Sequence, residues 1–430
     1  MEIINANPTK EFFIDMLTRD IKLERAIIDL IDNSIDGARN TKLEEGFNEY
    51  KVTLTINQNY FEIQDNCGGI ALDIALNQAF RFGRPSDAQT VNHSIGRFGV
   101  GMKRALFKIG NNFTIESKHG EDHFLIEVNV KQWVKEESWE FEYTPVNRGD
   151  KPGKLTEDGT YIKIDNLHSN IASEFNLTHF INQLNADITR TLSYIINQGL
   201  TIIVNNTTLQ SEEVEILKSE KIQPIAKSLK LAGDQVTVQI FAGIGEASPE
   251  KAGWYIYCND RLILEKDKTN LTGWEGRIYD ESDTVKFHHI YAMFRGIVSF
   301  QADDSTLLPI TTTKTGIDAN SNIYKRVKEE MISMMKQVIS FLKKLKTDED
   351  REEIKTDTEK VNVNNLKVED FKETFRYPEI QSAKASSRFA NISYKKEKDK
   401  IDTVKKALNI SSNREVGEET FDYFYKMEVE

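Results

Sequence analysis

Cysteine is scarce in this chain of 430 residues, which contains only Cys67 and Cys258. Neither cysteine has a metal-ligating neighbour at a useful spacing, and two cysteines cannot form a disulfide scaffold. The sequence therefore argues against a zinc module and against a disulfide-rich secreted domain. A reducing compartment, the cytoplasm, is the resulting expectation.

Long hydrophobic runs and an excess of positive charge are also missing. The apolar runs are far shorter than the roughly 20 residues that cross a bilayer, so no transmembrane helix is expected. Residues 1–5 show no basic region followed by an apolar core, so no signal peptide is expected. The net charge of −12 excludes the whole molecule as an electrostatic trap for nucleic acid, while a local basic patch stays open.

Histidine offers no catalytic or metal-binding group either. The chain has seven histidines, and the only adjacent pair, His288 and His289, falls in a stretch that reads as a strand. Neighbouring residues of a strand point to opposite faces, so these two imidazoles are not expected to bind one metal ion.

Regular helix and strand patterns fill the first 172 residues. A helical pattern covers residues 11–39, and the sequence predicts strands at 52–56, 61–63, 113–118, 122–130, 138–143 and 159–165. This order favours an α+β fold with a layer of helices on one antiparallel or mixed sheet. Residues 1–172 are expected to form this first domain.

The rest of the chain predicts a second domain, a linker and a tail. Residues 173–346 contain a helix at 177–198, strands at 200–206, 235–242, 253–258 and 287–300, and an amphipathic helix at 321–346. The run at 347–360 is nearly all charged and indicates a linker or a solvated extension of the helix. Residues 361–430 form the expected tail, with helices at about 396–408 and 414–427.

The helix around residues 26–38 carries an unusual polar face. Asp29, Asn33 and Asp36 share this face, without the lysines and arginines that solvated helices normally mix in, beside a face of isoleucines. Half-buried carboxylates without a cationic partner are costly, and Mg²⁺ with nucleotide phosphates would supply the missing positive charge. A solvated helix or a set of caps is the alternative interpretation.

Three further segments carry residues suited to binding a nucleotide. Asp65 ends a strand and is followed by the turn Asn66-Cys67-Gly68-Gly69-Ile70. Gly99-Val100-Gly101 precedes an expected helix at 101–109, whose free N–H groups would bind anions, with Arg97 and Lys103 nearby. Thr160 lies in a strand candidate. Each segment alone has an ordinary structural alternative: a plain turn, a solvent-facing lysine or a common strand residue.

Together the four segments resemble the GHKL superfamily, the ATPases of gyrase B, heat-shock chaperones, histidine kinases and MutL. The details are most similar to MORC-type and MutL-type members, and the resemblance runs from about Asn5 to Lys336. It implies a Bergerat-type α/β sandwich followed by an S5-like transducer domain. It also implies that the cofactors are ATP and Mg²⁺.

The resemblance assigns roles to individual residues. It implies that Asn33 holds Mg²⁺, that Asp29 orients or activates the attacking water, and that Lys314 reaches the γ-phosphate. Asp65 would accept a hydrogen bond from the adenine amino group, supported by Thr160. The remaining nucleotide-binding positions that it implies are Gly69, Ile70, Gly99, Val100, Gly101 and Lys103.

Two positions of this chain differ from the family pattern, and two further segments resemble parts of the family with a known role. The family has Glu where this chain has the shorter Asp29, so either the helix lies closer to the phosphate or hydrolysis is slow. The family has a glycine where this chain has Cys67. Residues 76–98 resemble a mobile lid with hinges at Gly83 and Gly96. The segment 254–263, with its Asn259-Asp260-Arg261 turn, is interpreted as scaffold.

The function expected from these residues is an ATPase that acts mechanically, with ATP bringing two chains together as a homodimer and hydrolysis releasing them. One alternative is a nucleotide-sensing scaffold with negligible turnover. Another is a DNA-associated clamp in genome maintenance or defence, for which lysines between 395 and 406 are the sequence support. A solvated, partner-binding helical pair explains these lysines better, because acidic residues interleave them. An effector protein is expected, and the sequence does not identify it.

Overall fold

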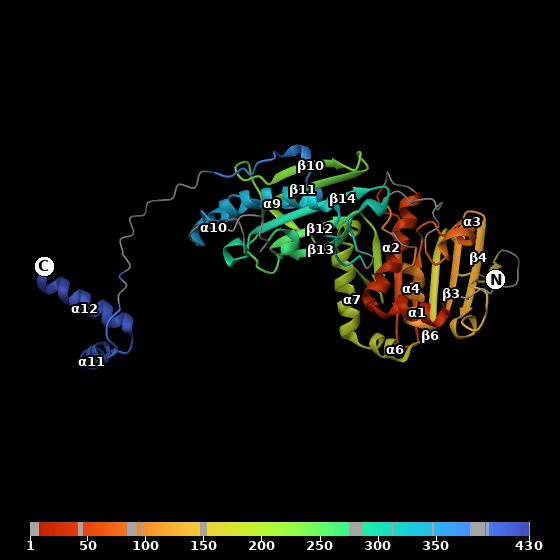
Figure 1. The fold of residues 1–430 in the computed structure, drawn as a ribbon, viewed down its shortest axis with the longest axis horizontal. Coiled ribbons are helices and arrows are strands. Elements are labelled where there is room, and N and C mark those ends of the chain that lie inside the picture. The colour runs from red at the N-terminus through yellow and green to blue at the C-terminus, as the bar shows by residue number, and fades with distance from the viewer. Residues whose placement is uncertain are drawn as a thin grey trace, which may run out of the picture. The chain divides into compact units, whose positions relative to one another are not determined.

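The computed structural model describes residues 8–41, 46–83, 93–95, 99–146, 153–274, 286–311, 314–345, 348–378, 392 and 395–429. Its contacts divide the chain into one unit that ends at Pro378 and a second that begins at Glu379. Among its described residues, the first unit contains three sheets, of eight, five and two strands (Figure 1).

The first sheet has eight strands and carries the N-terminal domain. In spatial order they are β5 (Tyr143–Pro145), β4 (Asp122–Asn129), β3 (Gly110–His119), β6 (Gly159–Leu167), β2 (Tyr60–Asp65), β1 (Lys51–Ile56), β7 (Thr201–Val204) and β8 (Thr207–Thr208). Only the β1–β7 pair is parallel. The sheet is therefore mixed, which is one of the two alternatives that the sequence left open.

Alternating burial explains why these segments form strands. In β1, Val52, Leu54 and Ile56 are buried, and the residues between them are exposed or half-buried, as in a sheet with one face on the core. The register places Asp65 of β2 opposite Thr160 of β6, and Thr160 opposite Ser117 of β3. Three residues distant in sequence thus lie in one row across the sheet.

Helices cover this sheet, and α2 and α4 pack against each other (Figure 1). The helices of this part are α1 (Lys10–Arg19), α2 (Leu23–Thr41), α3 (Leu72–Ile74), the π-helix η1 (Ala75–Ala79), α4 (Gly101–Ile109), α5 (Val130–Trp133), α6 (Ser169–Phe175), α7 (Thr178–Thr191) and α8 (Ser193–Asn197). The helix predicted at 11–39 is two helices, because α1 ends at its C-cap Asp20.

The N-terminal domain extends beyond the predicted boundary at residue 172. Strand β7 pairs with β1, and α6 to α8 contribute buried residues such as Phe180, Leu184 and Ile188 to the first core. The predicted strand at 200–206 therefore belongs to the first sheet, not to the second domain. Pairing at a sheet edge depends on partners about 150 residues away, which a local pattern does not reveal. Residues 138–142, expected as a strand, are not part of one, and β5 begins at Tyr143.

The second domain is built on a five-stranded sheet with the long helix α9 (Asn322–Leu342) packed on it. The strand order is β10 (Ile225–Leu231), β11 (Val236–Ile244), β14 (Phe294–Ala302), β12 (Gly253–Cys258) and β13 (Arg261–Asp267). The 3-10 helices are η2 (Asn270–Thr272), η3 (His289–Tyr291) and η4 (Ser305–Leu307). Methionines 331, 334 and 335 of α9 are buried, as its amphipathic pattern predicted.

Residues 348–378 belong to this domain rather than to a linker and tail. Helix α10 (Asp348–Thr356) is followed by β15 (Glu359–Asn362), which pairs with β9 (Glu215–Lys218), and by the 3-10 helices η5 (Val363–Asn365) and η6 (Val368–Asp370). Val363, Val368 and Phe375 are buried. The predicted tail start at residue 361 is thus displaced, because apolar residues spaced along an irregular segment anchor it.

The second unit contains two helices, α11 (Lys398–Leu408) and α12 (Asn413–Glu428), in the stretch where the sequence predicted two. Ser412 and Glu415 form a capping box at the start of α12. Within the described part of this unit, Val416 is the buried apolar side chain, and aromatic residues such as Phe421 and Phe424 are exposed.

Candidate functional site

Asp65 forms one end of the candidate site. It is the last residue of β2, is 8% exposed, and accepts hydrogen bonds from Ser34 Oγ (2.6 Å) and from the backbone N–H groups of Cys67 (2.9 Å) and Thr160 (3.1 Å). Burial raises the pKa of Asp65, and these three donors oppose that rise. The carboxylate is therefore fixed in direction by groups from α2, from its own turn and from the neighbouring strand.

The turn after Asp65 requires glycine. Gly69 has a φ of +67°, and a Cβ at this position would lie 2.0 Å from the carbonyl oxygen of Lys118. Cys67, which replaces a family glycine, is buried and is not among the residues with positive φ, so a side chain fits there. Ile70 continues the turn, and its N–H donates to Ser117 Oγ at 2.7 Å.

The N-terminus of α4 forms the middle of the site. Gly99 has a φ of +64°, Val100 is the N-cap, and no side chain of the described residues caps the helix. A Cβ on Gly101 would lie 3.4 Å from the Cβ of Asp29 and 3.5 Å from its Oδ2. The first turn of α4 therefore lies against the Asp29 carboxyl group, and its N–H groups suit an anion such as phosphate.

For Lys103 the sequence left two positions open, one near a phosphate and one facing solvent. Its side chain is buried, not solvated, and its Nζ donates to the carbonyl oxygen of Ala79 at 2.8 Å. Burial lowers the pKa of Lys103 to about 8. In this structure the lysine therefore connects α4 to η1, at the start of the predicted lid.

The predicted lid is described only in part. Gly83 has a φ of +97°, and no atom lies within 4 Å of the Cβ it would carry. Asp36 accepts hydrogen bonds from Ser94 Oγ (2.9 Å) and from the N–H of Ile95 (2.8 Å). Gly96, Arg97 and residues 84–92 lie outside the described residues. Asp36 thus binds Ser94 and Ile95, the two described residues directly before Gly96.

The polar face of α2 is divided between solvent and core. Asn33 is exposed, whereas Asp29 is 5% exposed and Asp32 is fully buried. Lys314 lies 3.2 Å from Asp29 Oδ1 and 2.7 Å from Asp32 Oδ2. Arg261, which is also fully buried, pairs with Asp32 Oδ2 through Nη1, and this nitrogen is 3.7 Å from Asp29 Oδ1. Two carboxylates and two cations therefore form one buried cluster.

Burial dominates the electrostatics of both cations. It lowers the pKa of Arg261 to about 10, an effect that Asp29 opposes and Arg25 adds to. It also lowers the pKa of Lys314, with Asp29 opposing. Lys314 adopts a left-handed backbone conformation, with a φ of +54°. For a residue other than glycine such a conformation is uncommon, and it occurs at sites that must aim a side chain.

The cluster corrects two interpretations of the sequence. The acidic face of α2 has basic partners after all, and they come from the second domain, so the absence of nearby lysines is no argument for Mg²⁺. Arg261, interpreted as scaffold, lies in the cluster beside the predicted Asp29 and Lys314. Asp32 was not predicted either. The one sequence signal was the unbalanced charge on α2, which requires cations from elsewhere.

The turn that carries Arg261 contacts the N-terminal domain through three consecutive residues. Asn259 Nδ2 donates to the carbonyl of Ser94 (3.0 Å), and Asp260 Oδ2 accepts from Arg39 Nη2 (2.9 Å). The φ values of Asn259 and Asp260 are +44° and +66°, as in the type I′ turn of a tight hairpin. Arg261, the first residue of β13, follows directly, so the hairpin fixes its position.

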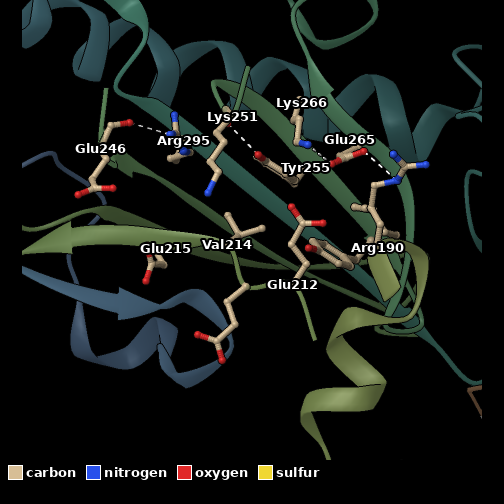
Figure 2. Close-up of a pocket in the computed structure, with 13 residues that line it drawn as sticks. Arg190, Glu212, Val214, Glu215, Glu246, Lys251, Tyr255, Glu265, Lys266 and Arg295 are labelled. Carbon is tan, nitrogen blue, oxygen red and sulfur yellow. Dashed lines mark hydrogen bonds and ion pairs between the residues drawn. The ribbon is translucent and has the colours of Figure 1, made fainter. Parts of the chain in front are cut away.

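A small cavity of about 40 Å³ lies elsewhere, lined by residues of α7, β12 and β13 and of the segment before β9 (Figure 2). Figure 2 shows Glu265 paired with Arg190 (3.1 Å) and Lys266 (2.5 Å), and the Tyr255 hydroxyl on the carbonyl of Lys251 (2.8 Å). The volume of this cavity is too small for a nucleotide. None of its lining residues belongs to the site described above.

The comparisons with known proteins address the N-terminal part of the chain. Residues 21–161 match the family model described as histidine kinase-, DNA gyrase B-, and HSP90-like ATPase. This part of the chain is therefore similar to the GHKL-type ATPase domain. The match contains Asp29, Asn33, Asp65 and Thr160 and ends before Arg261 and Lys314. No curated protein matches the chain. Across the described residues, no helix is both long and apolar enough to cross a membrane.

The residues present fit an adenine nucleotide. Asp65 offers a directed acceptor, and the uncapped first turn of α4 offers N–H donors to phosphate. Arg261 keeps Nε and Nη2 without a hydrogen-bond partner among the described residues, although the side chain is fully buried. Unpartnered buried donors are costly, and the carboxylate of Asp32, paired with Nη1, is the anion that contacts this guanidinium.

A magnesium ion at a nucleotide needs fewer protein ligands than the nucleotide itself. Among the described residues, no group of three or more His, Cys, Asp or Glu side chains is placed to hold a metal ion. Mg²⁺ at a nucleotide takes one or two protein oxygens and otherwise phosphates and waters. The exposed amide of Asn33, one helical turn after Asp29, fits that need.

Proposed function

We propose that this chain binds Mg²⁺-ATP at the site between β2, α2 and α4, hydrolyses it slowly, and uses it to bring two chains together. The observation that carries the proposal is the position of Asp29, whose carboxyl group lies against the first turn of α4 and within 3.2 Å of Lys314. A carboxylate next to a phosphate-type helix end is suited to positioning a water beside the terminal phosphate.

The chain's own groups divide the work of binding. Asp65 would accept a hydrogen bond from the adenine amino group, which guanine cannot donate at that position. The N–H groups of residues 99–101 and the Lys314 ammonium would face the phosphates, and Asn33 would be a ligand of Mg²⁺. When bound, Mg²⁺ would neutralise charge on the phosphates.

Hydrolysis would depend on Asp29 releasing Lys314. An ion-paired carboxylate is a weak base, and Asp is one methylene shorter than the Glu of the related families, so turnover would be slow. A contact of Lys314 that forms with ATP and is lost with ADP would give the two domains a nucleotide-dependent interaction. That difference would drive dimerisation with ATP and release after hydrolysis.

Calorimetry of Asn33→Ala tests the nucleotide site. We expect the wild-type chain to bind Mg²⁺-ATP and to discriminate against Mg²⁺-GTP, and Asn33→Ala to lose Mg²⁺-ATP binding while keeping its melting temperature. Asn182→Ala, also an exposed asparagine inside a helix, is the matched control. Equal affinity for ATP and GTP, or unchanged ATP affinity in Asn33→Ala, would refute the assignment.

Sedimentation velocity tests the dimerisation. We expect a larger dimer fraction with a non-hydrolysable ATP analogue than with ADP, and loss of that difference in Lys314→Ala. The same mass in both nucleotide states would remove the dimerisation mechanism and leave the nucleotide site standing.

A nucleotide-sensing scaffold without turnover is the second candidate. The close ion pair between Lys314 and Asp29 favours it, because it withholds the base from water. Steady release of phosphate above the background of Asp29→Ala would exclude this reading. A DNA-associated clamp is a third proposal. Salt-dependent DNA binding that is lost when Lys405 and Lys406 are replaced would support it.

A further inference from the structure

Arg261 and Lys314 do not have equal places in the buried cluster. Lys314 lies within ion-pair distance of both carboxylates, 3.2 Å from Asp29 and 2.7 Å from Asp32. Arg261 contacts Asp32 directly and lies 3.7 Å from Asp29. The two cations therefore share Asp32, and Lys314 is the nearer partner of Asp29.

The two cations also differ in freedom. Arg261 begins β13, directly after a hairpin turn whose neighbouring residues are held by Ser94 and Arg39 of the N-terminal domain. Lys314 lies on a loop, and its ammonium is a point charge on a flexible stem with three donors. The guanidinium is suited to a permanent contact and the ammonium to an exchangeable one.

We propose that Arg261 is a positioning residue that neutralises Asp32 and thereby leaves Lys314 free to move between Asp29 and the terminal phosphate of a bound nucleotide. This inference rests on the proposed ATP site. Without the guanidinium, two buried carboxylates would compete for a single ammonium, and the terminal phosphate could not attract it. Arg261 would thus set the preference for ATP over ADP through Lys314.

The charges facing Lys314 come from two elements, α2 and β13. Asp29, Asp32 and Asp36 lie on α2, Arg261 lies on β13, and Arg25 acts on Arg261 from α2. Asp32 contacts both cations, and the guanidinium of Arg261 supplies the second positive charge that balances the two carboxylates. Removing both partners together should leave Lys314 in nearly its original surroundings.

The test measures the affinities of the full chain for ADP and for a non-hydrolysable ATP analogue at fixed free Mg²⁺. Arg261→Gln should lower the ratio of analogue affinity to ADP affinity by about tenfold or more, since one uncompensated charge acts on the ammonium. Arg295→Gln is the matched control. Arg295 is also buried in the same domain but donates to the backbone carbonyls of Ala292 and Phe294. It donates as well to the carbonyl of Glu246, a contact that Figure 2 shows.

The double variant Asp32→Asn with Arg261→Gln decides the role. It should restore the wild-type ratio, because neither the charge nor its counter-ion remains. It also serves if Arg261→Gln alone does not fold, since it leaves no unpaired charge in the core. A ratio that stays low in the double variant means that Arg261 binds the phosphate itself and overturns the inference.

The remaining outcomes distinguish failure of the inference from failure of the proposed function. An unchanged ratio in Arg261→Gln, or an equal loss in Arg295→Gln, contradicts the inference and leaves the nucleotide site intact. A wild-type chain that binds neither nucleotide overturns the proposed function, and the inference with it.

Discussion

The two ends of the candidate site are held in different ways. At the end proposed to bind adenine, the adenine end, Asp65 is oriented by Ser34, Cys67 and Thr160, all from the N-terminal domain. At the end proposed to bind phosphate, the phosphate end, Asp29 and Asp32 are paired with Arg261 and Lys314, both from the second domain. The adenine end is therefore complete within one domain, and the charge balance of the phosphate end depends on how two domains meet.

The difference has a consequence for switching. Nucleotides that share an adenine but differ in the terminal phosphate should be distinguished only at the end where the second domain takes part. A nucleotide-dependent change between domains needs such a differential contact.

Replacing Asp65 should remove the acceptor that is proposed to bind the adenine amino group. Asp65→Asn should weaken ADP and an ATP analogue by the same factor, roughly 100-fold, because a required acceptor is replaced by a group that can also donate. Calorimetry with both nucleotides measures this. An Asp65→Asn variant that weakens only the ATP analogue would break the comparison.

The same variant should not cost stability. Because burial raises the pKa of Asp65, the folded state disfavours its charged form, and this cost appears as the pH rises above the unfolded value of 3.8. The free energy of unfolding of Asp65→Asn relative to wild type should therefore increase from pH 4 toward neutral pH. Urea melts at several pH values measure it, and the opposite slope would show that hydrogen bonding to the charged form dominates.

Asp29→Asn should affect turnover rather than affinity. A group that orients water acts mainly in the transition state, so kcat should fall roughly 100-fold with little change in the dissociation constant for ADP. Steady-state phosphate release and calorimetry on the same preparation provide the two values. Turnover at the wild-type rate would show that Asp29 is not the base and would favour the scaffold reading.

Gly69→Ala should show how rigid the adenine end is. The new methyl would meet the carbonyl of Lys118 at 2.0 Å with φ at +67°, and a loss of about 2–3 kcal/mol in the free energy of unfolding is expected. Gly83→Ala is the matched control, because its φ is also positive but no atom lies within 4 Å. Equal losses in chemical denaturation would mean that only the backbone conformation matters.

The smallest effect is expected for Lys103, whose contribution to the free energy of unfolding should depend on pH. Since burial lowers its pKa to about 8, the folded state releases this proton before the unfolded state does, and stability rises with pH between about 8 and 10.5. Relative to Lys103→Met, the wild-type chain should gain about 1 kcal/mol between pH 7 and pH 9. A constant difference across that range would show that the lysine is not buried as described.

Sequence reasoning named Asp65, Asp29 and Lys314 as site residues and did not name Asp32 or Arg261. The α+β class, the strands β1 to β4 and β6, and the positions of Asp65, Gly101 and Asp29 follow from local patterns and short motifs. The pairing of β7 with β1 and the anchoring of residues 359–378 depend on partners far along the chain, so the predicted boundaries at 172 and 361 were displaced. Arg261 was interpreted as scaffold for the same reason, because the carboxylate with which it pairs lies 229 residues earlier in the numbering.

The most direct test of the account compares Asp65→Asn and Lys314→Gln in one calorimetric series with ADP and a non-hydrolysable ATP analogue. The account predicts that Asp65→Asn weakens both nucleotides equally, while Lys314→Gln weakens the analogue by roughly tenfold or more and leaves ADP nearly unchanged. If Lys314→Gln weakened both nucleotides by the same factor, the second domain would not distinguish the terminal phosphate, and the central claim would be contradicted.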